Sequence, residues 1–172
     1  MSVKQTLVTL AACILLASPA VADGVTIADL QAPAGSEATI AAARAFYDFW
    51  NTGDEAFLAR AIAPSFTDHT PPPGRPQGPT GPAVASRQFR GAVPDLSVKV
   101  EKMIVAGDYV TVHMVFSGSF TGKLGNTQGR GQKIAFIATD LVKVTSGRIT
   151  DNWHIEDNLT LLQQMGIAKV GE

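Results

Sequence analysis

The sequence predicts an α+β domain, with helices in its first half and antiparallel strands in its second half. Up to about residue 90, apolar residues recur at the spacing of a helical face. From Leu96 onward they alternate with polar residues, as they do in strands with one buried face. The chain has 172 residues, which is enough for one domain with its own hydrophobic core.

Three helices are expected before the strands. Ser36 is a suitable N-cap, Gly53 follows the end of the first helix, and Asp54 is a suitable N-cap for the second. A segment rich in proline and glycine, PPPGRPQGPTGP, then excludes regular structure and is typical of a functional or mobile loop. The expected helices span residues 36–52, 54–63 and 82–90.

The first 22 residues have the pattern of a secretory signal peptide. The positive end MSVK precedes the apolar run TLVTLAACILLAS, and Ala20, Val21 and Ala22 form a cleavage pattern. The run is too short for a membrane span, and no later segment is long enough for one. We expect cleavage after Ala22 and export to the periplasm or medium, with 23–35 as an extension and 36–170 as the folded domain. A lipoprotein signal ending at Cys13 is the alternative.

Composition excludes several classes of site. Cleavage would remove Cys13, the only cysteine, and with it any disulfide, thiolate nucleophile or cysteine metal ligand. The 14 basic and 15 acidic residues are scattered, so we expect no nucleic-acid partner. The three histidines lack the spacing of a metal site, and we expect no metal.

The strand region provides the candidate site. YVTVHMVFSGSF is the clearest strand, and Ser146-Gly147 is a two-residue hairpin signal between the last two strands. Counting back from this loop pairs Asp140 with Trp153 and Phe136 with Asp157. The more apolar face should be the inner one. It would carry Val110, Val112, Met114, Phe116, Phe120, Phe136, Ala138, Asp140, Val142, Trp153, Ile155 and Asp157, whereas His113, His154 and Glu156 would point outward.

Two acids on an apolar face suggest proton-transfer chemistry. Burial raises the pKa of a carboxyl group and allows it to exchange protons near neutral pH. Structural roles are the alternative: Asp157 would cap the final helix, and Asp140 would pair with a lysine or with the indole of Trp153.

Several segments, in order, resemble the SnoaL-like polyketide cyclases, or ester cyclases, of the nuclear transport factor 2-like superfamily. They are FTDHTPPPG, AVPDLSVKVEKMIVAGDYV, GSFTG, the D-x-x-K-V-x-x-G-R-I run from Asp140, and NWHIEDNLTLLQQMG, and they cover residues 40–166. The resemblance implies a cone in which three helices pack on a curved antiparallel sheet, with a short C-terminal helix. It also implies aldol-type ring closure of a polyketide ester without any metal or organic cofactor.

The resemblance assigns site residues as well. It makes Asp157 the general acid/base, with His69 as a donor to the substrate carbonyl. Many relatives have a histidine where this chain has Phe120, which makes the expected pocket more apolar. The expected lining residues are Trp153, Asp140, Phe120, Phe136, Met114, Phe116 and Trp50.

We therefore expect an exported protein that performs cofactor-free acid/base chemistry on a small apolar carbonyl or polyketide-like compound. It would be an aldol-type cyclase or an isomerase- or lyase-like enzyme. A non-catalytic binding module for an apolar molecule is the alternative. Epoxide hydrolysis is disfavoured, because Met114 and Phe116 stand at inward positions where an Arg and an Asp would be required. We also expect a homodimer through the outer sheet face, where Ile137, Thr139 and Leu141 lie.

Overall fold

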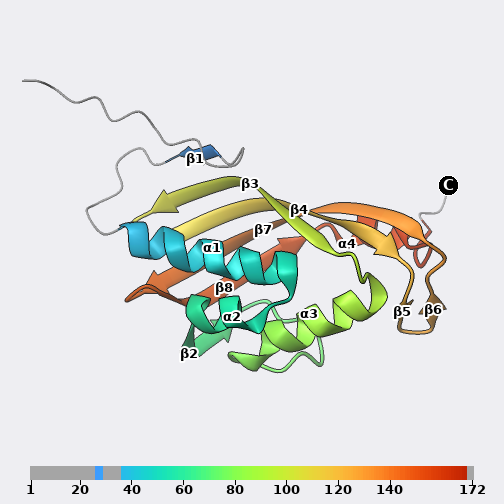
Figure 1. Cartoon of the computed structure of the whole chain (residues 1–172), viewed down its shortest axis with the longest axis horizontal. Coiled ribbons are helices and arrows are strands. Elements are labelled where there is room, and N and C mark those ends of the chain that lie inside the picture. Colours follow the sequence, from blue (N-terminus) through green and yellow to red (C-terminus); the bar gives the residue numbers. More distant parts are fainter. Residues whose placement is uncertain (1–25, 29–35, 170–172) are drawn as a thin grey trace, which may run out of the picture.

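The computed structural model describes residues 26–28 and 36–169. The expected signal peptide, Cys13, the cleavage position after Ala22 and most of the extension lie outside these residues. Four helices and eight strands follow one another along the described chain (Figure 1). The helices are α1 (Ser36–Thr52), α2 (Glu55–Ala61), α3 (Thr80–Ala92) and α4 (Asn158–Gln164). The strands are β1 (Thr26–Ala28), β2 (Ile62–Asp68), β3 (Ser97–Ala106), β4 (Tyr109–Phe120), β5 (Lys123–Leu124), β6 (Thr127–Gln128), β7 (Gln132–Thr145) and β8 (Arg148–Glu156).

The main sheet has the order β1-β3-β4-β7-β8-β2. Its four central strands are antiparallel neighbours, while β1 and β2 pair in parallel with β3 and β8 at the two edges. Helices α1, α2 and α3 lie on the concave side of this curved sheet (Figure 1). The predicted α+β class and the cone-like arrangement are confirmed, with the parallel edge strands as an addition.

Local signals account for the helix boundaries. Asp54 caps α2, as predicted, because its Oδ1 atom accepts a hydrogen bond of 2.8 Å from the backbone N–H of Ala56. The helix ends at Ala61, earlier than expected, because the chain enters β2 at Ile62. Within the described residues, no helix combines the length and apolar character needed to cross a membrane.

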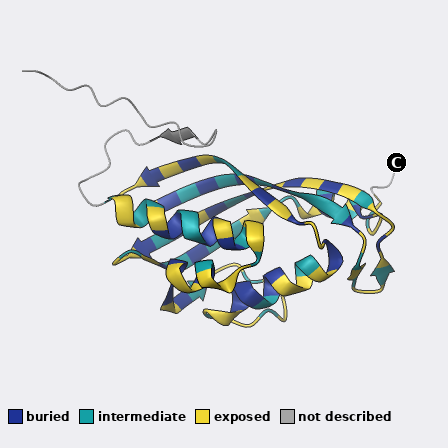
Figure 2. Cartoon of the chain, viewed as in Figure 1, coloured by how far each residue is buried: buried dark blue, intermediate teal, exposed yellow. Residues whose placement is uncertain are grey.

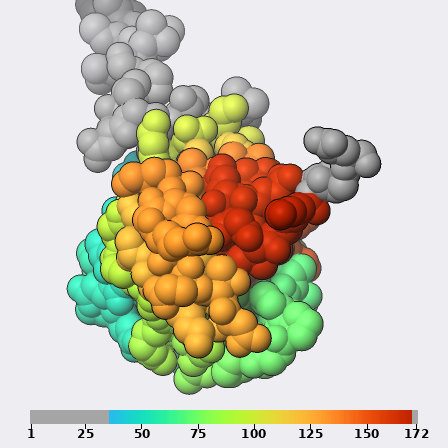
Figure 3. Space-filling view, turned by 90° about the vertical axis from the view of Figure 1, so that its right-hand side faces the viewer, coloured from blue at the N-terminus to red at the C-terminus, as the bar shows by residue number. Residues whose placement is uncertain are grey.

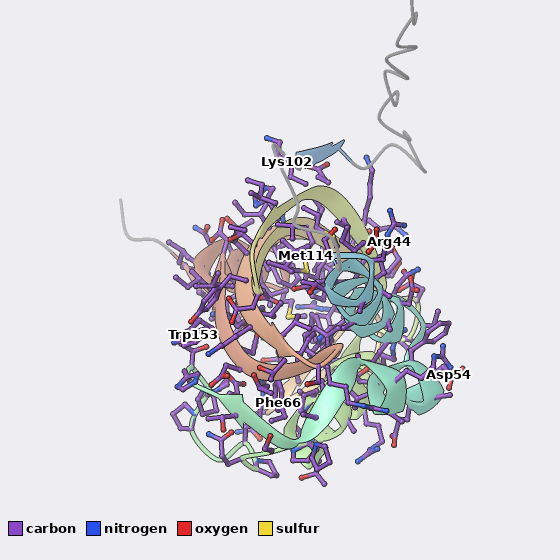
Figure 4. All side chains as sticks on the ribbon, turned by 90° about the vertical axis from the view of Figure 1, so that its left-hand side faces the viewer. Arg44, Asp54, Phe66, Lys102, Met114 and Trp153 are labelled. Carbon is purple, nitrogen blue, oxygen red and sulfur yellow. The ribbon has the colours of Figure 1, made fainter. Side chains whose placement is uncertain are left out.

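The core lies between the helices and the inner sheet face. The alternation predicted for β4 is confirmed, because buried residues alternate with partly buried ones along most of this strand (Figure 2). Met114 lies inside the curve of the sheet and is 1% exposed, whereas Trp153 lies outside it (Figure 4). The predicted inward residues of β4 are all buried, namely Val110, Val112, Met114, Phe116 and Phe120.

The hairpin between β7 and β8 determines which side chains of β8 face the interior. Ser146 and Gly147 both have positive φ angles, 52° and 72°, and Thr145 pairs with Arg148, as expected for a two-residue turn. A β-bulge then shifts the register, so that Val144 pairs with Ile149 but Lys143 pairs with Asp151.

The bulge makes the predicted register wrong beyond this point. Asp140 pairs with His154 and not with Trp153, and Ala138 pairs with Glu156. Because side chains alternate along a strand, one extra residue exchanges the two faces of the rest of β8. The inner face of β8 therefore carries Asn152, His154 and Glu156, while Trp153, Ile155 and Asp157 face outward.

Candidate active site

A cavity of about 230 Å³ opens between the inner sheet face, the helices and the loop after β2. In the end view, the C-terminal segment (red) lies beside the orange segment that includes the start of β7 and beside the green segment that follows β2 (Figure 3). Apolar and aromatic side chains form most of its wall, namely Phe46, Trp50, Pro82, Ala85, Phe89, Phe116, Leu124, Leu161 and Leu162. The polar lining residues are Asp68, Arg75, Gln88, Asp140, Asn152, His154, Glu156 and Asn158.

A hydrogen-bonded row crosses the floor of this cavity. The Nδ1 atom of His154 bonds to Oδ1 of Asp140, and its Nε2 atom lies 3.1 Å from Oε2 of Glu156. The second oxygen of Asp140 accepts a hydrogen bond of 3.1 Å from the hydroxyl of Tyr47 in α1. Asp140 is 2% exposed and uses both oxygens, so it holds the ring while Glu156 remains at the cavity surface.

The two carboxylates keep His154 protonated. Burial alone lowers the pKa of this imidazole, but the hydrogen bonds and negative charges of Asp140 and Glu156 outweigh it and raise the pKa to about 10. At neutral pH the ring is therefore an imidazolium that donates from both nitrogens. The pKa of Tyr47 is raised by its burial and by the adjacent Asp140, so this phenol stays neutral.

Glu156 has the complementary property. Burial favours its neutral form and raises its pKa, but the hydrogen bond and charge of His154 and the charge of Arg75 overcome this effect. The net result is a pKa below the ordinary value. Glu156 is therefore an ionised carboxylate next to an apolar cavity, beside a cation that can stabilise a developing negative charge.

The loop after β2 supplies Arg75. Gln77 ties this loop to β2, because its Nε2 donates to the backbone oxygen of Asp68 (2.7 Å) and its Oε1 accepts from the Asp68 backbone N–H (2.9 Å). The hydroxyl of Thr70 also accepts a hydrogen bond of 2.8 Å from the backbone N–H of His154. The segment rich in proline and glycine thus forms one wall of the cavity.

The structure places Asp157 outside this cavity. Its carboxylate caps α4, accepting hydrogen bonds from the backbone N–H (3.0 Å) and the hydroxyl (2.6 Å) of Thr160. These bonds, that of the hydroxyl first, lower the pKa of Asp157. This arrangement is the structural alternative given by the sequence, and the inward placement was wrong because of the bulge.

His69 and Trp153 also lie on the outer side of β8. Their rings stack with centroids 4.4 Å apart, and Nε2 of His69 lies 2.8 Å from Oδ1 of Asp151. The bond from His69 is the largest of the effects that lower the pKa of Asp151. The prediction that Trp153 lines the pocket was therefore wrong, and His69 is not directed at the cavity floor.

The remaining predicted lining residues divide into two groups. Trp50, Phe116 and Asp140 do line the cavity. Met114, Phe120 and Phe136 are buried in the core behind it, where Phe136 stacks on Phe116 at 5.2 Å between centroids.

The sequence pattern missed His154 and Glu156, which it assigned to the outer face. One signal could have found them: the shifted register places Asp140 opposite His154, a charge-complementary pair that the regular register separates. Among the described residues, no group of three or more His, Cys, Asp and Glu side chains has metal-binding geometry. Asp140 and Glu156 contact opposite nitrogens of the His154 ring, so these three groups do not converge on one point.

Comparisons with known proteins identify the family. The model of the SnoaL-like polyketide cyclase family matches residues 40–165. A candidate polyketide cyclase from Bacillus cereus ATCC 10987 is 38% identical, with a TM-score of 0.74, and the match covers 85% of this chain and 92% of that one. IdmH, a candidate polyketide cyclase from Streptomyces antibioticus, is 26% identical, with a TM-score of 0.67 and coverage of 74% and 98%. TsrD from Streptomyces laurentii is 25% identical, with a TM-score of 0.69 and coverage of 77% and 97%. The comparison with curated protein sequences gave no significant match.

The family model and the Bacillus structure together span nearly all of the described domain. They agree with the fold, a curved sheet covered by helices in the manner of nuclear transport factor 2. The chain belongs to the SnoaL-like polyketide cyclase family.

Proposed function

We propose that this protein is a cofactor-independent acid/base enzyme that closes a ring by an intramolecular aldol reaction of a carbonyl compound. Glu156 is the base, the His154 imidazolium is the hydrogen-bond donor, and Asp140 positions the imidazolium. The observation that carries this proposal is the row Asp140–His154–Glu156, which places an ionised carboxylate and a cation together in an apolar cavity. The family membership and the candidate cyclases among its relatives agree with it.

The proposed reaction is balanced without a co-reactant. Glu156 removes a proton from the carbon next to a carbonyl group and thereby loses its charge. Nε2–H of His154, which donates to Glu156 before this step, then donates its hydrogen bond to the resulting enolate oxygen. The enolate carbon then attacks a second carbonyl carbon of the same molecule and forms the ring bond. The new alkoxide takes the proton back from Glu156, which restores the starting carboxylate.

The electrostatics of the site support these roles. A base must be ionised before it acts, and the lowered pKa of Glu156 meets this requirement at neutral pH. A donor must keep its proton, and the raised pKa of His154 meets this requirement at neutral pH as well. Phe46, Trp50 and Phe116 form an aromatic wall of the cavity, and surroundings of low polarity strengthen both interactions.

Exchange of a carbon-bound proton tests the first step. 1-Tetralone has acidic hydrogens at C2, and their replacement in D₂O can be followed by proton NMR. We expect the purified protein to accelerate this exchange well above the buffer rate, and the Glu156→Gln variant to lose at least about a hundredfold of that acceleration.

The alternative, a binding module, predicts a different result. In that case 1-tetralone binds, as measured by calorimetry, but its exchange rate in the complex equals the buffer rate. Full exchange activity in a folded Glu156→Gln variant would also contradict the assigned base.

We also propose a homodimer and export. The support for the dimer is an apolar hollow on the outer sheet face, where Ile137, Leu141 and Ile155 are exposed, Ile155 by 75%. The support for export is the signal-peptide pattern ending at Ala22. Light scattering that shows only monomer would count against the first, and an uncleaved N-terminus in the native host would count against the second.

A further inference from the structure

Tyr47 is a buried tyrosine that contacts the polar floor of the cavity from α1. It is 3% exposed and is not itself a lining residue. Its ring packs edge-on against Phe46, with the two centroids 5.5 Å apart. A phenylalanine would make the same apolar contacts, so packing alone does not account for the hydroxyl group.

This hydroxyl group is bonded to the charged row of the site. It donates a hydrogen bond of 3.1 Å to Oδ2 of Asp140, whose other oxygen is bonded to Nδ1 of His154. Among the described residues, no third group donates to this carboxylate, and its only ion pair is with His154. Since Asp140 is 2% exposed, Tyr47 takes the place that water would have at its second oxygen.

One proton lies between Asp140 and His154, and it has two alternative positions. On Nδ1 it gives an imidazolium beside a carboxylate, and on Oδ1 it gives a neutral imidazole beside a carboxylic acid. Burial favours the neutral pair, because it removes both charges from water. A hydrogen bond to the carboxylate favours the charged pair, because it stabilises the ionised form of the acid.

We propose that Tyr47 is a positioning residue, whose hydroxyl group acts through Asp140 and keeps this proton on Nδ1 of His154. The inference rests on the function proposed above, which requires the charged ring in two ways. An imidazolium stabilises the enolate more than a neutral imidazole does. Its hydrogen bond and charge also lower the pKa of Glu156, so that the base is ionised.

The Tyr47→Phe variant removes the hydroxyl group and keeps the ring. In the free, ¹⁵N-labelled protein at neutral pH, the Nδ1 resonance of His154 is identified by its loss in His154→Gln. In Tyr47→Phe it should move from the imidazolium position toward that of an unprotonated ring nitrogen. Tyr109→Phe is the matched control, because Tyr109 is the only other tyrosine and lies beside Trp153 on the outer sheet face. It should leave the resonance in place.

The kinetics of 1-tetralone exchange separate this role from general packing. Tyr47→Phe should lower kcat about tenfold, leave KM within about twofold and move the acid limb of the rate to higher pH. In an Asp140→Asn background, the same change should alter kcat by less than about twofold, because Tyr47 acts only through the carboxylate. The ring resonance is measured without substrate. A wild type without exchange activity would therefore overturn the proposed function and leave the proton position to be tested.

Fluorination provides a test that does not depend on the folding of Tyr47→Phe. In Tyr109→Phe, incorporated 3-fluorotyrosine alters Tyr47 alone, and its more acidic phenol is a stronger donor of nearly the same size. The Nδ1 resonance should then move further toward the imidazolium position. An unchanged resonance or an unchanged kcat in Tyr47→Phe would overturn the proposal, as would movement toward the neutral position on fluorination. If Tyr47→Phe does not fold, an unchanged resonance after fluorination would overturn it as well.

Discussion

Asp140 and His154 lie opposite each other on β7 and β8, and the buried carboxylate of Asp140 binds Nδ1 of the imidazole. This contact leaves Nε2–H directed at Glu156 and the cavity. It depends on the bulge at Thr150 of β8, opposite Lys143 and Val144, which turns His154 inward. One inserted residue thus converts an apolar strand face into a charged one.

The Asp140→Asn variant should lower the pKa of His154 from about 10, because the ring loses the stronger of its two carboxylate partners. An NMR titration of the imidazole resonances would measure the shift. The Asp151→Asn variant is the control, since Asp151 bonds to His69 on the outer face and should leave the titration of His154 unchanged. An equally high pKa in Asp140→Asn would contradict the described pairing.

Stability should depend on pH through His154. Its pKa in the folded protein, about 10, exceeds the ordinary value of 6.5, so its stabilising contribution is complete below 6.5. The contribution is lost as pH rises from 6.5 to about 10. Urea unfolding of the wild type and of His154→Gln at several pH values measures it, and the difference between them should shrink over this range. A difference that grows with pH would reverse the predicted sign.

Asp157 should matter for stability and not for proton transfer. The Asp157→Ala variant removes the acceptor for Thr160 at the start of α4 and should lower the urea midpoint. Asp157→Ser keeps a capping oxygen and should recover most of the loss. If the two variants are equally unstable, the cap is not the role of this side chain.

Arg75 should lower the pKa of the proposed base, Glu156. Its charge helps to lower the pKa of Glu156, so Arg75→Gln should move the acid limb of the exchange rate to higher pH. Arg87→Gln is a suitable control, because Arg87 pairs with Glu55 on the surface and does not line the cavity. The pH profile of 1-tetralone exchange provides the measurement. Identical acid limbs in the wild type, Arg75→Gln and Arg87→Gln would show that Arg75 does not affect the pKa of the base.

The sequence predicted most of the fold because periodic signals specify it locally. The alternation in β4, the cap at Asp54 and the turn at Ser146-Gly147 all appear in the structure. The site was not predictable in the same way, because the bulge after this turn has no local signature in the residues around Thr150. Because side chains alternate along a strand, one error in register places every later residue on the wrong face. The prediction therefore exchanged the faces of Trp153 and His154.

The most direct test compares two neighbouring acids, Glu156 and Asp157, in one assay. Exchange at C2 of 1-tetralone would be measured for the wild type, Glu156→Gln and Asp157→Asn, with folding checked by circular dichroism. The cavity site predicts a loss of at least about a hundredfold for Glu156→Gln and a rate within about twofold of the wild type for Asp157→Asn. The opposite order, with Asp157→Asn inactive and Glu156→Gln active, would contradict it.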